Sequence, residues 1–93
     1  MSESTDNEQE TLLEFPCEFP IKVMGKTAED FDALVVEIIL KYVDDLHEGA
    51  VSRRLSRNGK YVSITATITV DSKPQLDDIY RELSAHERIL MVL

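Results

Sequence analysis

The chain has little of what marks secreted, membrane and disulfide-linked proteins. It contains one cysteine, Cys17, so no internal disulfide can form and nothing indicates an oxidising compartment. Its longest apolar stretch, residues 34–40, is short and interrupted by Glu37, which argues against a membrane span. The N-terminus lacks the basic and apolar regions of a secretory signal. These absences predict a cytoplasmic protein with no membrane partner.

Basic residues are also scarce, since 10 Lys and Arg face 18 Asp and Glu and leave a net charge of −8. Such a charge disfavours non-specific binding to nucleic acid or to anionic membranes. Residues 1–14 hold five acidic residues and no basic one, so residues 15–93 carry only −3. We predict a disordered acidic tail at residues 1–10 and a single folded domain at residues 11–93.

A β-hairpin at Val51–Val70 is the strongest structural signal in the chain. Asn58-Gly59 is typical of a two-residue type I′ turn, in which both central residues have positive φ. After the turn, apolar and polar residues alternate from Tyr61 to Val70, so one face of this strand is buried. The pairing predicts that Val51 and Leu55 face the core. It also places Arg53 there, which requires a side chain that reaches past the sheet edge or a bulge that shifts the register.

Other elements follow from capping signals and periodicity. A strand is expected from Glu18 to Gly25, followed by a helix that Thr27 caps and that runs to about Val43. Ser72 caps a second helix, which ends near Ser84, and residues 88–93 form a last strand. Pro16 and Pro20 argue against a central strand or a long helix across Thr11–Pro20, and Thr11–Phe15 is expected to form a turn packed on the domain.

The order strand, helix, strand, strand, helix, strand predicts an α+β fold. Two right-handed βαβ crossovers around a hairpin give a ferredoxin-like βαββαβ sandwich, with an antiparallel sheet of order 4-1-3-2 and two helices on one face.

Three families with this topology require residues that can be sought. An RNA-recognition motif needs an aromatic platform, and the exposed sheet face offers only Tyr61, so we predict no nucleic-acid partner. An acylphosphatase needs an arginine loop after strand one and an asparagine on strand three, and both are missing. An ACT-type domain binds a small amino acid near the loop after strand one, which makes Met24, Gly25, Lys26 and Thr27 candidate ligand-binding residues.

Two features suggest contact surfaces. The basic cluster Arg53, Arg54, Arg57 and Lys60, beside Tyr61, could dock an acidic partner or a phosphate-bearing ligand, or its charges could protect an edge hairpin from aggregation. The acidic tail could also fold back on it. The last strand is apolar on both faces, so residues such as Leu90 and Val92 should be covered, either by Thr11–Phe15 or by a second subunit.

No catalytic constellation is readable. His47 lies with Asp44 and Asp45 in a short loop without metal-ligand spacing, and His86 has no partner nucleophile. Cys17 sits between phenylalanines and is expected to pack as a small hydrophobic residue. We expect no enzyme activity, metal or cofactor.

Four stretches together resemble the YbeD-like family of small uncharacterised bacterial proteins. They are LLEFPCEF at 12–19, IKVMG at 21–25, NGKYVSITATI at 58–68 and RILMVL at 88–93. The resemblance implies a ferredoxin-like fold similar to the regulatory domain of phosphoglycerate dehydrogenase, and it implies no established activity. The function predicted here is a stand-alone, non-catalytic regulatory or protein-interaction module with a protein partner or self-association. The alternative is a small-metabolite sensing domain that binds at the loop after strand one.

Overall fold

The computed structural model describes residues 14–47 and 49–93. Its elements are β1 (Cys17–Lys26), α2 (Phe31–Ile39), β2 (Val51–Leu55), β3 (Tyr61–Val70), α3 (Lys73–Ala85) and β4 (Ile89–Val92). The predicted tail at residues 1–10, and residues 11–13 of the predicted turn, lie outside the described residues.

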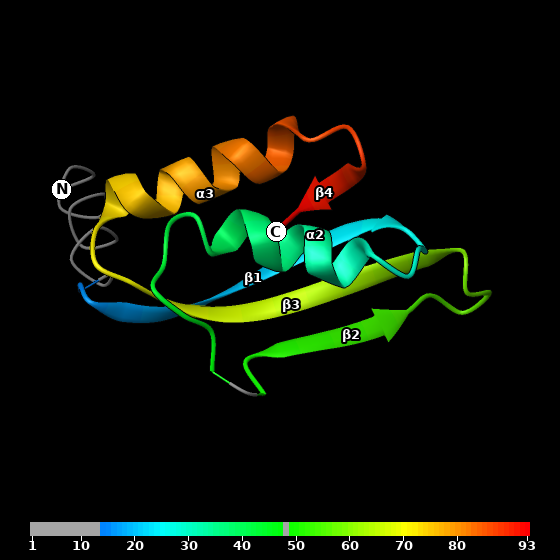
Figure 1. Cartoon of the computed structure of the whole chain (residues 1–93), viewed down its shortest axis with the longest axis horizontal. Coiled ribbons are helices and arrows are strands. Elements are labelled where there is room, and N and C mark those ends of the chain that lie inside the picture. The colour runs from blue at the N-terminus through cyan, green and yellow to red at the C-terminus, as the bar shows by residue number, and fades with distance from the viewer. Residues whose placement is uncertain (1–13, 48) are drawn as a thin grey trace, which may run out of the picture.

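The strands form one antiparallel sheet in the order β2-β3-β1-β4. Both helices lie on one face of it, so the predicted ferredoxin-like α+β sandwich is confirmed (Figure 1). The longest ladder joins β1 to β3, with Cys17 opposite Val70 and Lys26 opposite Tyr61. We call the other side of the sheet, which neither helix covers, the open face.

The core lies between the sheet and the helices. Alternate residues of β1 and β3 meet the apolar stripes of α2 and α3, as the period-two and helical patterns predict. The fully enclosed side chains include Ile21, Val23, Phe31, Val35, Ile39, Val62, Ile64, Ile68, Val70, Ile79 and Leu83.

The hairpin has the predicted register but a different turn. Val51 pairs with Ala66 and Leu55 with Val62, and the ladder has no bulge. Gly59 has φ +75°, whereas among the described residues, Asn58 included, none other than glycine has positive φ, so the turn is not type I′. Instead the Gly59 amide donates to the Ser56 carbonyl at 2.9 Å, and the Asn58 side-chain oxygen accepts from the Lys60 amide at 3.0 Å. The asparagine side chain therefore stabilises a longer loop.

The regular register settles the position of Arg53. Its side chain reaches the start of α2, where Nε lies 3.3 Å from Oδ1 of Asp32. Leu55 lies opposite Val62 on the core-facing side of the sheet, as predicted, but its side chain is 49% exposed at the end of β2.

The helix α2 is shorter than predicted at both ends. It begins at Phe31 because Thr27 does not cap it: the Thr27 hydroxyl donates to the Gly59 carbonyl at 2.7 Å. It ends at Ile39, after which the Lys41 and Tyr42 amides donate to carbonyls three residues back, the pattern of a tightened last turn. Among the described residues, no helix has the length and apolar character needed to cross a membrane.

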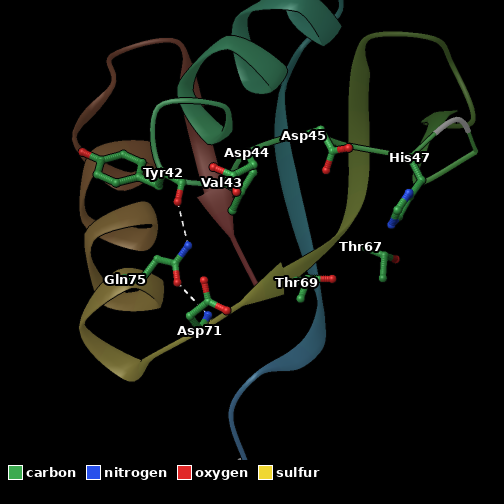
Figure 2. A pocket seen from close by; sticks show the side chains of 9 residues that line it. All are labelled: Tyr42, Val43, Asp44, Asp45, His47, Thr67, Thr69, Asp71 and Gln75. Atoms are coloured by element: carbon green, nitrogen blue, oxygen red, sulfur yellow. Dashed lines mark hydrogen bonds between the residues drawn. The ribbon is translucent and has the colours of Figure 1, made fainter.

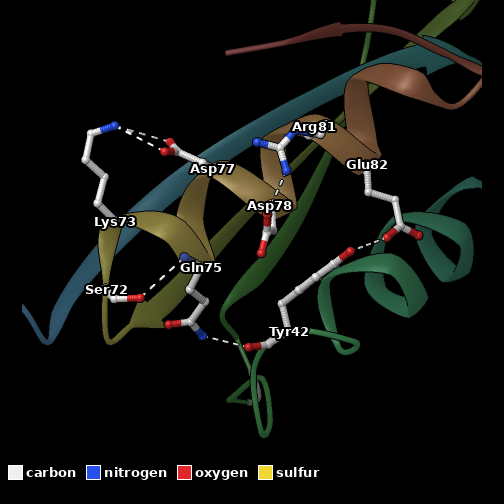
Figure 3. A network of polar contacts seen from close by, with 8 residues as sticks. All are labelled: Tyr42, Ser72, Lys73, Gln75, Asp77, Asp78, Arg81 and Glu82. Atoms are coloured by element: carbon white, nitrogen blue, oxygen red, sulfur yellow. Dashed lines mark hydrogen bonds and ion pairs between the residues drawn. The ribbon is translucent and has the colours of Figure 1, made fainter.

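The second helix, α3, begins as predicted. The Ser72 hydroxyl accepts from the Gln75 amide at 3.3 Å, and Pro74 lies in the first turn (Figure 3). The Gln75 side chain reaches back to the amide of Asp71, at 2.7 Å, rather than to that of Ser72. These two hydrogen bonds hold Asp71 and Ser72, the residues directly before α3, in place.

Pro20 lies inside β1, although β1 is central in the sheet, so the prediction that a proline argues against a central strand here is wrong. The reason is that β4 is short. Lys22 exchanges both backbone hydrogen bonds with Leu93, and among the described residues nothing continues β4 beside Cys17–Ile21. Because bonding direction alternates along a strand, the nitrogen of Pro20 points to the same side as that of Lys22, where no donor is needed.

Candidate functional site

The open face is formed by the polar positions of the strands. Cross-strand partners share a face, so the register places Lys22 beside Thr65, Met24 beside Ser63 and Arg54 beside Ser63. Its residues on the strands are Glu18, Pro20, Lys22, Met24, Lys26, Ser52, Arg54, Tyr61, Ser63, Thr65, Thr67, Thr69 and Met91. Glu18 is the single acidic side chain among these.

An exposed apolar strip lies along the β4 side of the open face. Met91 is 50% exposed and pairs with half-buried Met24, and Leu93, opposite Lys22, is 60% exposed. We call Met24, Met91 and Leu93 the apolar strip. Large apolar side chains that adjoin one another in this way are typical of contact surfaces.

The predicted pair Leu90 and Val92 does not form one surface. The register shifts between Met24 and Gly25, so the β4 ladder contains an irregularity at Leu90. Leu90 is 58% exposed, whereas Val92 is half-buried and packs against the core. A run of apolar residues carries no facing information, so the sequence alone does not show which side chains of β4 are exposed.

The basic residues divide into two sets. Five are ion-paired with carboxylates of the helical layer and its loops, in the pairs Lys41–Glu82, Arg53–Asp32, Lys73–Asp77, Arg81–Asp78 and Arg88–Asp30. The other five form no ion pair with any carboxylate in the described part of the chain, and they are Lys22, Lys26, Arg54, Arg57 and Lys60. All of this second set lies on the open face or at the adjoining hairpin tip.

A cleft of 170 Å³ on the open face brings part of this set together. Lys22 of β1 and Arg54 of β2 line it from either side of β3, together with Met24 of β1 and with Tyr61 and Ser63 of β3. The Lys60 ammonium lies 5.7 Å from the centre of the Tyr61 ring, within cation–π range. The predicted contact residues Arg54 and Tyr61 therefore meet in one cleft, next to Lys60, and Arg57 belongs to the neighbouring turn.

The predicted ligand loop, Met24–Thr27, is divided between different surroundings. Met24 belongs to the open face, and Gly25 is buried against the Phe31 ring and the Arg88 carbonyl. The Thr27 amide and hydroxyl both bond to the hairpin turn, at Lys60 and Gly59. Lys26 and Thr27 line a hollow of 350 Å³ together with Leu90 and Arg88.

The guanidinium of Arg88 is held beside that hollow by the carboxylate of Asp30, with nitrogen–oxygen distances of 2.7 and 3.0 Å. These charge-assisted hydrogen bonds lower the pKa of the Asp30 carboxyl. The pair joins the loop before α2 to the loop before β4.

A second, polar cleft of 230 Å³ lies at the other end of β3 and was not foreseen from the sequence (Figure 2). The Gln75 amide spans one wall of it, accepting from the Asp71 amide at 2.7 Å and donating to the Tyr42 carbonyl at 2.6 Å. Its other lining residues are Val43, Asp44, Asp45, His47, Thr67 and Thr69. Residues 42–47 and 67–75 are distant in sequence, so no local pattern could signal the cleft.

The groups that could act as nucleophile or base have structural surroundings. Cys17 is half-buried and packs against the core, and Nδ1 of His86 accepts from the Arg88 amide at 3.1 Å. His47 is exposed in the loop beside the polar cleft. Within residues 14–47 and 49–93, no three His, Cys, Asp or Glu side chains come close enough together to hold a metal ion.

Known proteins with related sequences are bacterial. A UPF0250 protein of Nitrosomonas europaea is 42% identical over 85 residues, covering 91% of this chain and 98% of that protein. A UPF0250 protein of Neisseria gonorrhoeae is 39% identical over 90 residues, covering 96% of this chain and 99% of that one. The solution structure of protein HP0495 from H. pylori has the same fold, with a TM-score of 0.68, 17% identity and coverage of 87% and 85% of the two chains.

A family model described as "Protein of unknown function (DUF493)" matches residues 10–93, nearly all of the chain. The resemblance to the YbeD-like family is thereby confirmed, and the chain belongs to the DUF493 family.

Proposed function

We propose that this protein is a stand-alone, non-catalytic regulatory or protein-interaction module whose contact surface is the open face. The observation that carries the proposal is the apolar strip. Met91 and Leu93 are at least half exposed beside Met24, while the other side of the same sheet is packed under two helices. Covering such side chains with a partner removes apolar surface from water.

The surroundings of the reactive groups support a non-catalytic role. A catalytic nucleophile needs a base within hydrogen-bond reach, and Cys17 packs against apolar side chains while His86 receives a backbone amide. A cytoplasmic location remains a prediction from the single cysteine and the N-terminal composition.

Site-specific photo-crosslinking in bacterial cells tests the contact surface. A photoreactive residue at Met91 is expected to give protein adducts of recurrent mass, because this position faces the partner. The matched control carries the same residue at Ala33, which is exposed on α2, and is expected to give no recurrent adduct. Equal labelling from both positions, or none from Met91, would count against the proposal.

Small-metabolite sensing is a second candidate, and the 350 Å³ hollow beside Lys26, Thr27 and Arg88 is the observation that favours it. It ranks second because the Thr27 hydroxyl and amide are already bonded to the hairpin turn. Titration with amino acids and phosphorylated metabolites should shift the amide signals of residues 24–29 if the candidate is right. Unchanged signals there would remove it.

A further inference from the structure

We infer that the open face docks an acidic segment of another protein, one in which carboxylates alternate with or flank apolar side chains. The inference rests on the proposed function and names the chemistry of the partner. Carboxylates of the segment lie against Lys22 and Arg54, and its apolar side chains cover the apolar strip.

The basic charge of the open face complements the charge of an acidic segment. Ion pairs use Arg53 of β2 and the basic residues of the helical layer, so the basic residues without an ion pair in the described part of the chain collect on the open face and the hairpin tip. Glu18 is the one carboxylate among the strand residues of the open face. The described part of the chain thus presents a basic surface on the open face, although the net charge of the whole chain is −8, and such a surface attracts an acidic partner.

The size of the cleft and its position beside the apolar strip also suit such a segment. Lys22 of β1 and Arg54 of β2 both line the 170 Å³ cleft, and a space of this size suits a carboxylate side chain rather than a large cofactor. Met24 lines the same cleft and is paired with Met91, so the cleft leads directly into the apolar strip. Methionine is flexible enough to fit apolar side chains of varied shape. A segment that offers both acidic and apolar side chains satisfies both parts of the surface.

Other occupants fit less well. A two-fold dimer through the open face would bring two copies of the same basic set together, and like charges oppose such contact. Single-stranded nucleic acid would need several aromatic side chains for stacking, and Tyr61 is the one aromatic residue on the strands of the open face.

Selection from a phage-displayed library of random peptides about twelve residues long tests the inference without assuming a partner sequence. The full chain, immobilised by its N-terminus, is expected to enrich peptides that combine Asp and Glu with Leu, Ile, Phe or Met. Enrichment of basic or uncharged peptides would overturn the inference. So would the absence of any enrichment.

Charge-reversal variants locate the binding site. K22E together with R54E is expected to weaken the binding of an enriched peptide by about tenfold or more, as expected from losing two exposed ion pairs and adding repulsion. The matched control, K73E with R81E, makes the same change in net charge on α3 and should leave affinity within about twofold. Circular dichroism and thermal unfolding check that both variants are folded. Equal weakening in the two variants would contradict docking on the open face.

Separate measurements test the apolar strip and the two competing occupants, nucleic acid and a second copy of the chain. M91S is expected to weaken peptide binding several-fold, whereas L40S, at a position 43% exposed on the helical side, should not. An oligouridine that binds more tightly than the peptides, or sedimentation showing a dimer that K22E/R54E dissolves, would overturn the inference. If crosslinks form at Met91 but K22E/R54E does not change peptide affinity, the proposed function is supported and the inference of an acidic partner is wrong. If no crosslink forms, the proposed function fails.

Discussion

At Gly25 the backbone of β1 lies close to the Phe31 ring and to the Arg88 carbonyl. A Cβ atom at this position would lie 2.5 Å from the Phe31 ring and 2.7 Å from the backbone oxygen of Arg88. The ring could turn, but the carbonyl belongs to the loop that enters β4. The glycine of the IKVMG stretch therefore has a packing role, whatever binds nearby.

The substitution G25A is expected to lower the free energy of unfolding by about 2–3 kcal/mol, because it forces atoms into occupied space. The control is G49A, where φ is +88° and an added Cβ meets no atom within 4 Å, so only the conformational cost of about 1 kcal/mol applies. Urea denaturation of both variants measures the difference. A G25A protein as stable as the parent would show that the β4 loop yields freely.

At the scale of elements, one polar cluster ties the end of α2 to α3. Glu82 of α3 accepts hydrogen bonds from Lys41 and from the hydroxyl of Tyr42, both in the turn after α2 (Figure 3 shows the Tyr42 bond). These bonds lower the pKa of the Glu82 carboxyl and raise the pKa of the Tyr42 phenol. The helices are thus joined by a group whose charge depends on pH.

The sign of the resulting pH dependence follows from the lowered pKa. Ionised Glu82 stabilises the folded state at pH values above its ordinary pKa of 4.5. This stabilisation is lost as the pH falls through the lower pKa that Glu82 has in the folded state. The variant E82Q should therefore be less stable than the parent near neutral pH, with the difference shrinking in acid. Urea midpoints at about pH 7 and about pH 3 measure it, with E18Q as the control. A difference that grew in acid would contradict this account.

Local patterns predicted the elements well and their ends less well. Alternation fixed the buried face of β3, and the Asn58-Gly59 pair placed the hairpin and its register. The start of α2 was missed because Thr27, a good capping residue by local chemistry, is used by the hairpin turn 32 residues away. The exposure of Leu55 was not foreseen because alternation cannot show how far the helical layer extends over β2.

The site was less predictable than the fold for the same reason. Arg54, Lys60 and Tyr61 are close in sequence, and the basic cluster singled them out. The position of Met91 on the open face depends on the irregular register of β4, and the division of the basic residues depends on ion pairs such as Arg88–Asp30 that span 58 positions. Contacts of this kind leave no trace in a local pattern.

At the scale of the whole molecule, β4 is shorter than β1, and among the described residues no strand pairs with the edge of β1 at Pro20. The variant P20A adds a backbone N–H that points to this edge, which is expected to promote pairing between copies. Sedimentation velocity over a range of concentrations should show more association for P20A than for the parent. P74A, the same substitution in the first turn of α3, should leave association unchanged, and identical behaviour of the two variants would count against a protective role for Pro20.

The division of the basic residues has a consequence for the kinetics of binding. Acidic residues outnumber basic ones in the helical layer and its loops, while the cations without an ion pair in the described part of the chain collect on the open face, so we expect this part of the molecule to carry a dipole moment directed through the sheet. Such a dipole rotates the protein as it nears an acidic partner, before any side chains touch. Ionic strength should then act on the association rate more than on the dissociation rate. A protein that would be repelled on average can in this way arrive with its sheet already facing its partner.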